Sequence, residues 1–111
     1  MYELYYPGDK MSTQTDVIEE VKEEIEVKEP SMFRVILHDD NKTTFDFVIY
    51  ILMSVFNKEY DEASELTFRV HDSGAATAGI YTFQIAETKV DEATSLARTN
   101  NYPLTLTAEE L

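Results

Sequence analysis

A period of two separates apolar from polar positions over residues 33–38. Phe33, Val35 and Leu37 fall on one side of this stretch, and Arg34 falls on the other. Successive side chains of a β-strand point to opposite faces. The pattern therefore predicts a first strand over residues 33–38, with a second face that is only partly polar.

Helical spacing of apolar residues begins after this strand and predicts a first helix over about 44–57. Thr43 stands three residues before Asp46, which resembles a capping box with Asp in place of Glu. A second helix is expected to begin with Asp61 as its cap and to stop at Gly74, because glycine readily adopts left-handed backbone.

The remaining pattern predicts a strand over 79–86, a third helix from a Thr88 cap to about Asn100, and a last strand over 104–107. The resulting order is β-α-α-β-α-β. This order favours an α+β sandwich, in which a small three-stranded antiparallel or mixed sheet is covered on one face by three helices.

Charge divides the chain into two parts. Residues 1–30 hold nine acids against three lysines, and no aromatic residue follows Tyr6 in this segment. Such a composition buries too little apolar surface to offset the entropy of ordering. We therefore expect a flexible acidic arm at 1–29 and one folded domain at 30–111.

Composition also narrows the functional classes. The absence of cysteine excludes disulfides and thiolate zinc sites, and a net charge of −13 disfavours nucleic-acid binding. No apolar run approaches ~20 residues, and the N-terminus lacks the layout of a secretory signal. We expect a soluble cytoplasmic monomer without a cofactor, a metal or a membrane partner.

Hydrogen-bond acceptors gather where the first strand ends. Asp39, Asp40 and Asn41 lie between that strand and the first helix, and His71 lies in the last turn of the second helix. Such a cluster can bind a cation, although acidic residues after a strand often only form turns. One interpretation is a metal-dependent hydrolase using Asp39, Asp40 and His71, because hard divalent cations prefer carboxylate oxygens; no obvious nucleophile accompanies them.

Several separated motifs occur together in one order. They are VILHDDNKTTFDFV at 35–48, Val70-His71, AETKV at 86–90, Ala97-Arg98 and Pro103-Leu104. Together they resemble the ClpS family of adaptors for the Clp ATPase-protease, without a gap over residues 30–107. The resemblance implies a protein that is not an enzyme. It would bind proteins with bulky apolar N-terminal residues (N-degrons) and deliver them to the N-terminal domain of a ClpA-type unfoldase with the ClpP protease.

The resemblance also implies roles for individual residues. The α-amino group of the substrate would be held by Asp39, Asp40, Asn41 and His71. The pocket for its side chain would be lined by Leu37, Thr43, Phe45, Val48, Thr67, Val70 and Leu104. The unfoldase interface would include Gln84 and Lys89, and the acidic arm would enter or obstruct the unfoldase during delivery.

Two departures from the family pattern change what is expected. The family loop reads Asn-Asp-Asp where this chain has Asp39-Asp40-Asn41, and Phe45 and Thr67 stand where methionines are common. We expect amine binding to survive with altered geometry. We also expect N-terminal Leu, Phe, Tyr and Trp to enter the pocket and β-branched Ile and Val to be rejected. A structural interaction domain remains a third interpretation, because the element order also resembles the C-terminal domain of the ribosomal stalk protein.

Overall fold

The computed structural model describes residues 30–111, so the predicted arm at 1–29 lies outside the described residues. The elements in chain order are β1 (Met32–His38), α2 (Phe45–Ser54), α3 (Tyr60–Ser73), β2 (Ala75–Thr82), α4 (Phe83–Thr99) and β3 (Thr105–Glu110). This order and the α+β class confirm the sequence prediction.

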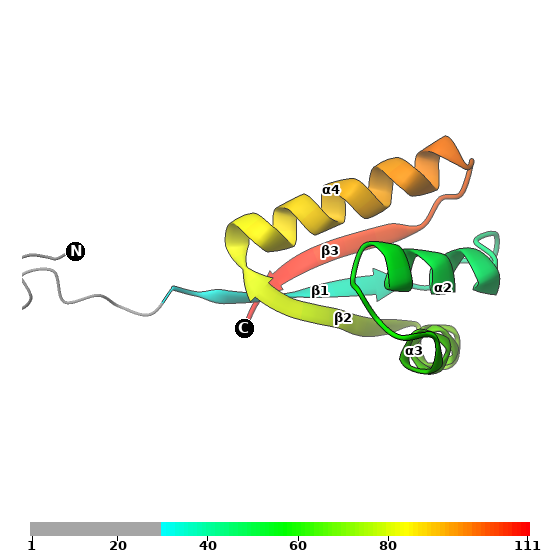
Figure 1. The fold of residues 1–111 in the computed structure, drawn as a ribbon, viewed down its shortest axis with the longest axis horizontal. Coiled ribbons are helices and arrows are strands. Elements are labelled where there is room, and N and C mark those ends of the chain that lie inside the picture. Colours follow the sequence, from blue (N-terminus) through cyan, green and yellow to red (C-terminus); the bar gives the residue numbers. More distant parts are fainter. Residues whose placement is uncertain (1–29) are drawn as a thin grey trace, which may run out of the picture.

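The three strands form one antiparallel sheet in the order β2-β1-β3, with β1 in the centre. Helix α4 runs along the sheet, whereas α2 and α3 pack against each other near the end of β1 (Figure 1). A register irregularity between Val35 and Ile36 interrupts the β1–β2 ladder. The C-terminal end of the central strand therefore points toward the junction of α2 and α3.

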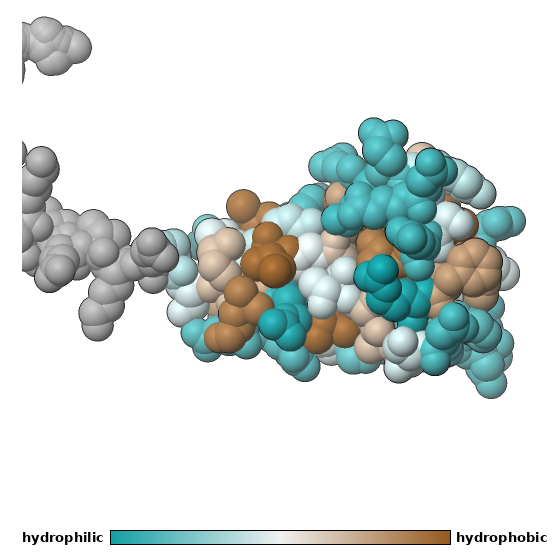
Figure 2. Space-filling model, turned by 90° about the horizontal axis from the view of Figure 1, so that it is seen from below, coloured by the Kyte–Doolittle hydropathy of each residue, from teal (hydrophilic) through white to brown (hydrophobic). Residues whose placement is uncertain are grey.

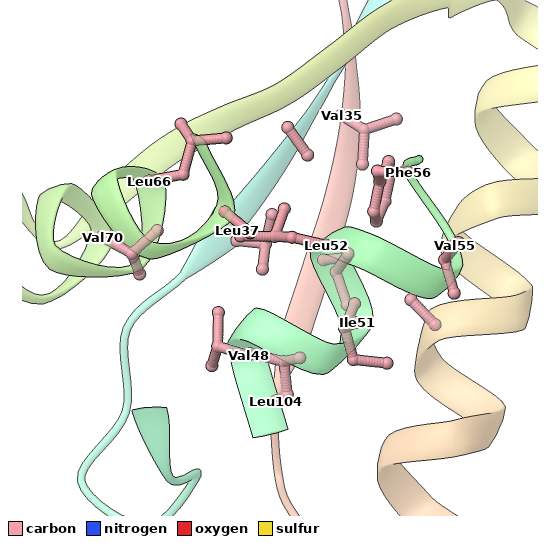
Figure 3. Close-up of a cluster of buried hydrophobic side chains, with 14 of the residues drawn as sticks. Val35, Leu37, Val48, Ile51, Leu52, Val55, Phe56, Leu66, Val70 and Leu104 are labelled. Atoms are coloured by element: carbon pink, nitrogen blue, oxygen red, sulfur yellow. The ribbon is translucent and has the colours of Figure 1, made fainter. Parts of the chain in front are cut away.

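The core lies between the sheet and the helices. The alternating side chains of Val35 and Leu37 are fully buried, and they lie in one cluster with Leu52 and Phe56 (Figure 3). Leu104, just before β3, is also fully buried. Each such aliphatic side chain contributes about 1.5–3 kcal/mol by leaving water. The core thus joins β1, α2 and the start of β3, the elements that surround the predicted site.

The first helix is shorter than predicted, covering 45–54 instead of 44–57. Thr44 is its N-cap, and its hydroxyl accepts a hydrogen bond from the Phe47 N–H at 3.2 Å. The predicted pairing of Thr43 with Asp46 was therefore wrong by one residue. Similarly, α3 starts at Tyr60 after Glu59 rather than with an Asp61 cap.

The largest correction concerns the second strand, which covers 75–82 instead of 79–86. The small residues before Gly79 have the composition of a turn, yet Ala76 pairs with Leu37, and Ala78 is almost fully buried. Pairing with β1 outweighs their weak strand propensity. Consequently α4 begins at Phe83 rather than after Thr88, and β3 extends over 105–110 instead of 104–107.

Gly74 ends α3 as the sequence predicted. Its φ of +89° lies in the left-handed region, and its N–H donates to the Val70 carbonyl at 2.8 Å. A Cβ added at this position would meet no heavy atom within 4 Å. Any cost of a side chain at Gly74 is therefore conformational rather than steric crowding by neighbours.

Gly74→Ala should lower the free energy of unfolding by about 1–2 kcal/mol, because an L-residue pays that cost in left-handed backbone. Urea denaturation followed by circular dichroism measures the change. Gly74→Asn is the matched variant and should lose less, because asparagine tolerates this region better. Equal stability of Gly74→Ala and the wild type would contradict the assignment of Gly74 as a conformational stop.

Candidate functional site

A narrow pocket opens where β1, α2, α3 and the approach to β3 meet. Its cavity volume is about 10 Å³, close to the space that one water molecule requires. The residues lining it are His38, Asp39, Asp40, Thr43, Phe45, Val48, Thr67, Val70, His71 and Leu104. Segments that are far apart in the sequence thus place polar and apolar side chains around one small opening.

Asp39 and His71 form the polar side of this pocket. The Asp39 Oδ2 and His71 Nδ1 atoms are 3.8 Å apart, and both side chains are partly exposed to solvent. The Asp39 N–H donates to the Gly74 carbonyl at 2.9 Å, which ties the loop after β1 to the end of α3. The 3.8 Å between the Asp39 and His71 side chains is too long for a direct hydrogen bond. One donor nitrogen at ~2.8 Å from each atom could nevertheless bond to both.

Asp40 organises the loop itself. Its carboxylate accepts hydrogen bonds from the Lys42 N–H at 2.8 Å, the Thr43 N–H at 2.7 Å and the Thr43 hydroxyl at 2.7 Å. Burial alone would raise the pKa of Asp40. The bonds from Thr43 and Lys42, together with the charge of Arg98, outweigh burial and lower that pKa below 3.8. The negative charge is thus held in place beside the pocket.

Phe45 stands at the mouth of the pocket. Its ring meets Phe68 edge-on at 5.2 Å between centroids and His71 edge-on at 5.1 Å. Such contacts are favourable for aromatic rings. Phe45 remains 36% exposed, so the ring is held on one side and open to water on the other.

Thr67 also lines the pocket, with a smaller side chain than Phe45. It is buried, and its hydroxyl donates to the Ala63 carbonyl one turn earlier at 2.8 Å. Its polar group is therefore satisfied within α3. Val48, Val70 and Leu104 supply buried apolar surface around it. The inner part of the pocket is consequently suited to an apolar group.

Two predicted site residues lie outside the lining of the pocket. Leu37 is buried in the core beneath it, and Asn41 is an exposed residue of the loop. The sequence prediction missed His38, which lines the pocket; its Nε2 lies 2.8 Å from Thr107 Oγ1. Its position immediately before the acidic loop was the available signal.

Gln84 and Lys89 lie on α4, at the opposite end of β1 from the pocket. Gln84 is exposed in the first turn of the helix, not in a strand as predicted. The Lys89 ammonium donates to the Val55 carbonyl at 2.7 Å and lies 5.6 Å from the Tyr81 ring centroid. It therefore caps the end of α2, so it is not only a solvated surface group.

Residues 30–111 contain neither a membrane-spanning helix nor a cluster of metal-ligating side chains. No helix there is both long and apolar enough to cross a membrane. The same residues contain no group of three or more His, Cys, Asp or Glu side chains that could hold a metal ion. Asp39, Asp40 and His71, the set considered for a metal-dependent hydrolase, thus do not form a metal site.

Comparison with known proteins agrees with this geometry. The family model described as ATP-dependent Clp protease adaptor protein ClpS matches residues 28–107. The adapter protein ClpS of Clostridium acetobutylicum is 46% identical over 101 residues, covering 91% of this chain and 100% of the relative. That of Nitratidesulfovibrio vulgaris is 48% identical over 88 residues, covering 79% and 88%. The chain belongs to the ClpS family.

A solved structure supports the same assignment at the level of the fold. Agrobacterium tumefaciens ClpS2 bound to L-phenylalaninamide superposes with a TM-score of 0.73 and 32% identity, covering 75% of this chain and 100% of that chain. As a ClpS protein, this chain is an adaptor that brings N-degron substrates to the Clp protease, and it is not an enzyme. The hydrolase and ribosomal-stalk interpretations are therefore wrong.

Asp40→Asn should lower the free energy of unfolding at pH 7 by about 1–2 kcal/mol, because an uncharged amide accepts these hydrogen bonds more weakly. The lowered pKa means that the ionised Asp40 stabilises the folded state. This contribution is complete above the ordinary Asp pKa of ~3.9 and is lost as the pH falls through the lower folded-state value. Urea unfolding at pH 7 measures the full contribution, and unfolding at pH 3 measures its decrease in acid.

Asp91→Asn provides the control, because it removes the same charge from an exposed position on α4. It should change stability little at either pH. A difference between Asp40→Asn and the wild type that is as large at pH 3 as at pH 7 would contradict the role of the Asp40 charge.

Proposed function

We propose that the pocket binds the free N-terminus of a substrate protein whose first residue is bulky and apolar. The observation that carries the proposal is the Asp39–His71 pair, with atoms 3.8 Å apart at the edge of an apolar pocket. A protonated amine donates three hydrogen bonds. Asp39 and an imidazole nitrogen would accept two of them, and the ordered charge of Asp40 lies nearby.

The relative bound to L-phenylalaninamide supports this assignment. That ligand carries a free α-amino group beside an apolar aromatic side chain, and its carboxylate is replaced by an amide, as in a peptide. In our proposal the amine would lie at Asp39 and His71, and the side chain would enter between Val48, Thr67 and Leu104. Asn41 would contact the substrate only from the exposed loop.

The small cavity implies that the pocket opens when a substrate binds. A cavity volume of about 10 Å³ is close to what one water molecule requires, and a Leu or Phe side chain is several times larger than a water molecule. Phe45 is the wall best placed to move, because its ring is partly exposed and packs only edge-on against Phe68 and His71. A side chain that branches at Cβ is broadest where it would pass through the narrow mouth of the pocket. We therefore propose that Ile and Val are rejected.

We further propose that the opposite end of the domain docks on the N-terminal domain of a ClpA-type unfoldase. Gln84 and Lys89, the two residues that the family resemblance implies for this interface, lie there. Ile80, Phe83 and Ile85 are each about half exposed at the same end, and Figure 2 shows apolar atoms gathered where β1 begins. An exposed apolar group of this kind is typical of a protein-binding surface.

The protein would act as a monomer in the cytoplasm of a bacterium, together with the ClpP protease. The acidic segment 1–29 would act during delivery to the unfoldase. Separate ends of the domain for substrate and unfoldase would allow one molecule to hold both partners at once.

Peptides that differ only at residue one test the substrate site. Peptides starting with Leu, Phe, Tyr or Trp should bind, whereas Ile and Val peptides should bind at least ~10-fold more weakly because the Cβ branch meets the pocket mouth. N-acetylation should abolish binding, since it removes the charge and most of the donors. Fluorescence anisotropy with labelled peptides measures each dissociation constant.

Asp39→Asn is the informative variant in this assay, with Asp91→Asn as its charge-matched control. The first should weaken binding of a free Leu peptide by ~10-fold or more, and the second should leave it unchanged. Equal affinity for free and acetylated Leu peptides would rule out the amine site. Equal affinity for Ile and Leu peptides would rule out the proposed selectivity alone.

Gln84→Ala should weaken binding to the isolated N-terminal domain of a ClpA-type unfoldase by ~3- to 10-fold without changing the free energy of unfolding. Lys89→Met should weaken the same binding and also lower stability by about 1 kcal/mol, because the Val55 carbonyl loses its donor. Calorimetric titration and urea unfolding separate the two effects. Affinities equal to that of the wild type for both variants would place the unfoldase surface elsewhere.

A further inference from the structure

The chain between α4 and β3 is built as a tight turn that leads into the pocket wall. Asn101 has a left-handed φ of +64°. Its N–H donates to the Arg98 carbonyl at 3.0 Å, and the Tyr102 N–H donates to the Ala97 carbonyl at 2.8 Å. This pair of bonds is a Schellman motif. The turn reverses the chain and is followed directly by Pro103 and Leu104.

The Arg98 side chain closes this turn from outside. Its Nη1 donates to the Tyr102 carbonyl at 2.8 Å and to the Leu104 carbonyl at 2.9 Å. Pro103, which lies between these carbonyls, has no N–H to donate. One guanidinium therefore holds both ends of the three-residue segment that carries Leu104 to its place.

The same segment reaches the start of α2. The Tyr102 ring packs on Phe47 with 4.6 Å between centroids, and its hydroxyl lies 3.5 Å from Thr44 Oγ1. Thr44 is the N-cap of α2 and directly follows the loop that Asp40 organises. Fixing Tyr102 thus braces the elements on two sides of the pocket.

We propose that Arg98 is a positioning residue for the N-degron pocket, because it fixes the segment that presents Leu104 to the first side chain of the substrate. This inference rests on the proposed function, in which Leu104 contacts that side chain. Leu104 is almost completely buried, yet it lines the cavity. Its position depends on the backbone that Arg98 holds, because Leu104 immediately precedes β3 and lacks the strand ladder on that side.

The charge of Arg98 adds a second effect on the same site. It is one of the causes that lower the pKa of Asp40, after the hydrogen bonds from Thr43 and Lys42. A simpler account would assign Arg98 to the helix dipole alone, since a cation in the last turn of α4 is favourable there. Lysine would serve the dipole equally well. Its side chain is one bond shorter than that of arginine and ends in a single ammonium, so it would not reproduce the clamp.

Arg98→Lys and Arg98→Gln separate these accounts. Arg69→Lys and Arg69→Gln are the matched controls, because Arg69 is exposed on α3. The assay compares free peptides starting with Leu and with Ala, together with the acetylated Leu peptide. The Leu-over-Ala preference reports the side-chain pocket, whereas the free-over-acetylated preference reports the amine site at Asp39 and His71.

We expect Arg98→Gln to reduce the Leu-over-Ala preference by ~10-fold or more and Arg98→Lys by at least ~3-fold. Discrimination against acetylation should persist in both variants. A general loss of stability would instead weaken all peptides alike, and urea unfolding identifies conditions in which every variant is folded. Leu-over-Ala preferences equal to those of the Arg69 variants would overturn the proposal.

Measurements on the protein without peptide test the positioning role of Arg98 independently of the proposed function. In Arg98→Gln, the Leu104 methyl resonances should shift, and the Tyr102 amide should exchange with solvent ~10-fold faster or more. Unchanged resonances and exchange would overturn the positioning role even if the peptides bind as expected. If the wild type binds free and acetylated Leu peptides equally, the proposed function fails, and these two measurements alone decide whether Arg98 positions Leu104.

Discussion

The hydrogen bond from the Asp39 N–H to the Gly74 carbonyl, 2.9 Å long, holds together the two halves of the candidate site. It joins the end of the central strand to Gly74, the left-handed residue that ends α3. Together with the neighbouring pairing of His38 with Ala75, it places the loop residue Asp39 beside His71 in the last turn of α3. Because it is a backbone bond, its geometry is set by the fold, and the polar pair is positioned before any substrate arrives.

The apolar part of the site depends on a different kind of constraint, namely close packing. Phe45 forms a large, partly exposed wall of the pocket, and Thr67 forms a small, buried one. The cavity between them is only about 10 Å³, because Phe45 occupies the mouth against Phe68 and His71. Arg98 completes the enclosure by holding the segment that carries Leu104.

The sequence predicted those features of the fold whose signals are local. The strand at β1, the stop at Gly74 and the order of elements were predictable, since alternation, helical spacing and glycine act within a few residues. The second strand was misplaced because Ala75, Ala76 and Ala78 become a strand only through pairing with β1. That error also put Gln84 in a strand, although it lies in the first turn of α4. Asp40 was predicted as a substrate ligand, and only the structure shows that its carboxylate also accepts three hydrogen bonds from its own loop.

By itself, the sequence determined the α+β class, the family and the set of side chains available to the site, because these follow from local patterns and from motifs in a fixed order. Only the tertiary structure decided how that set is divided. Asp39 lies with His71, Asp40 bonds to Lys42 and Thr43, Asn41 lies outside the pocket lining, and Lys89 caps α2. The physical reason is that the Lys89–Val55 contact joins residues 34 apart in the chain, and the Asp39–His71 contact spans a similar separation, which residue order alone does not specify. The bonds of Asp40 are local, but they depend on the conformation that the loop adopts in the fold.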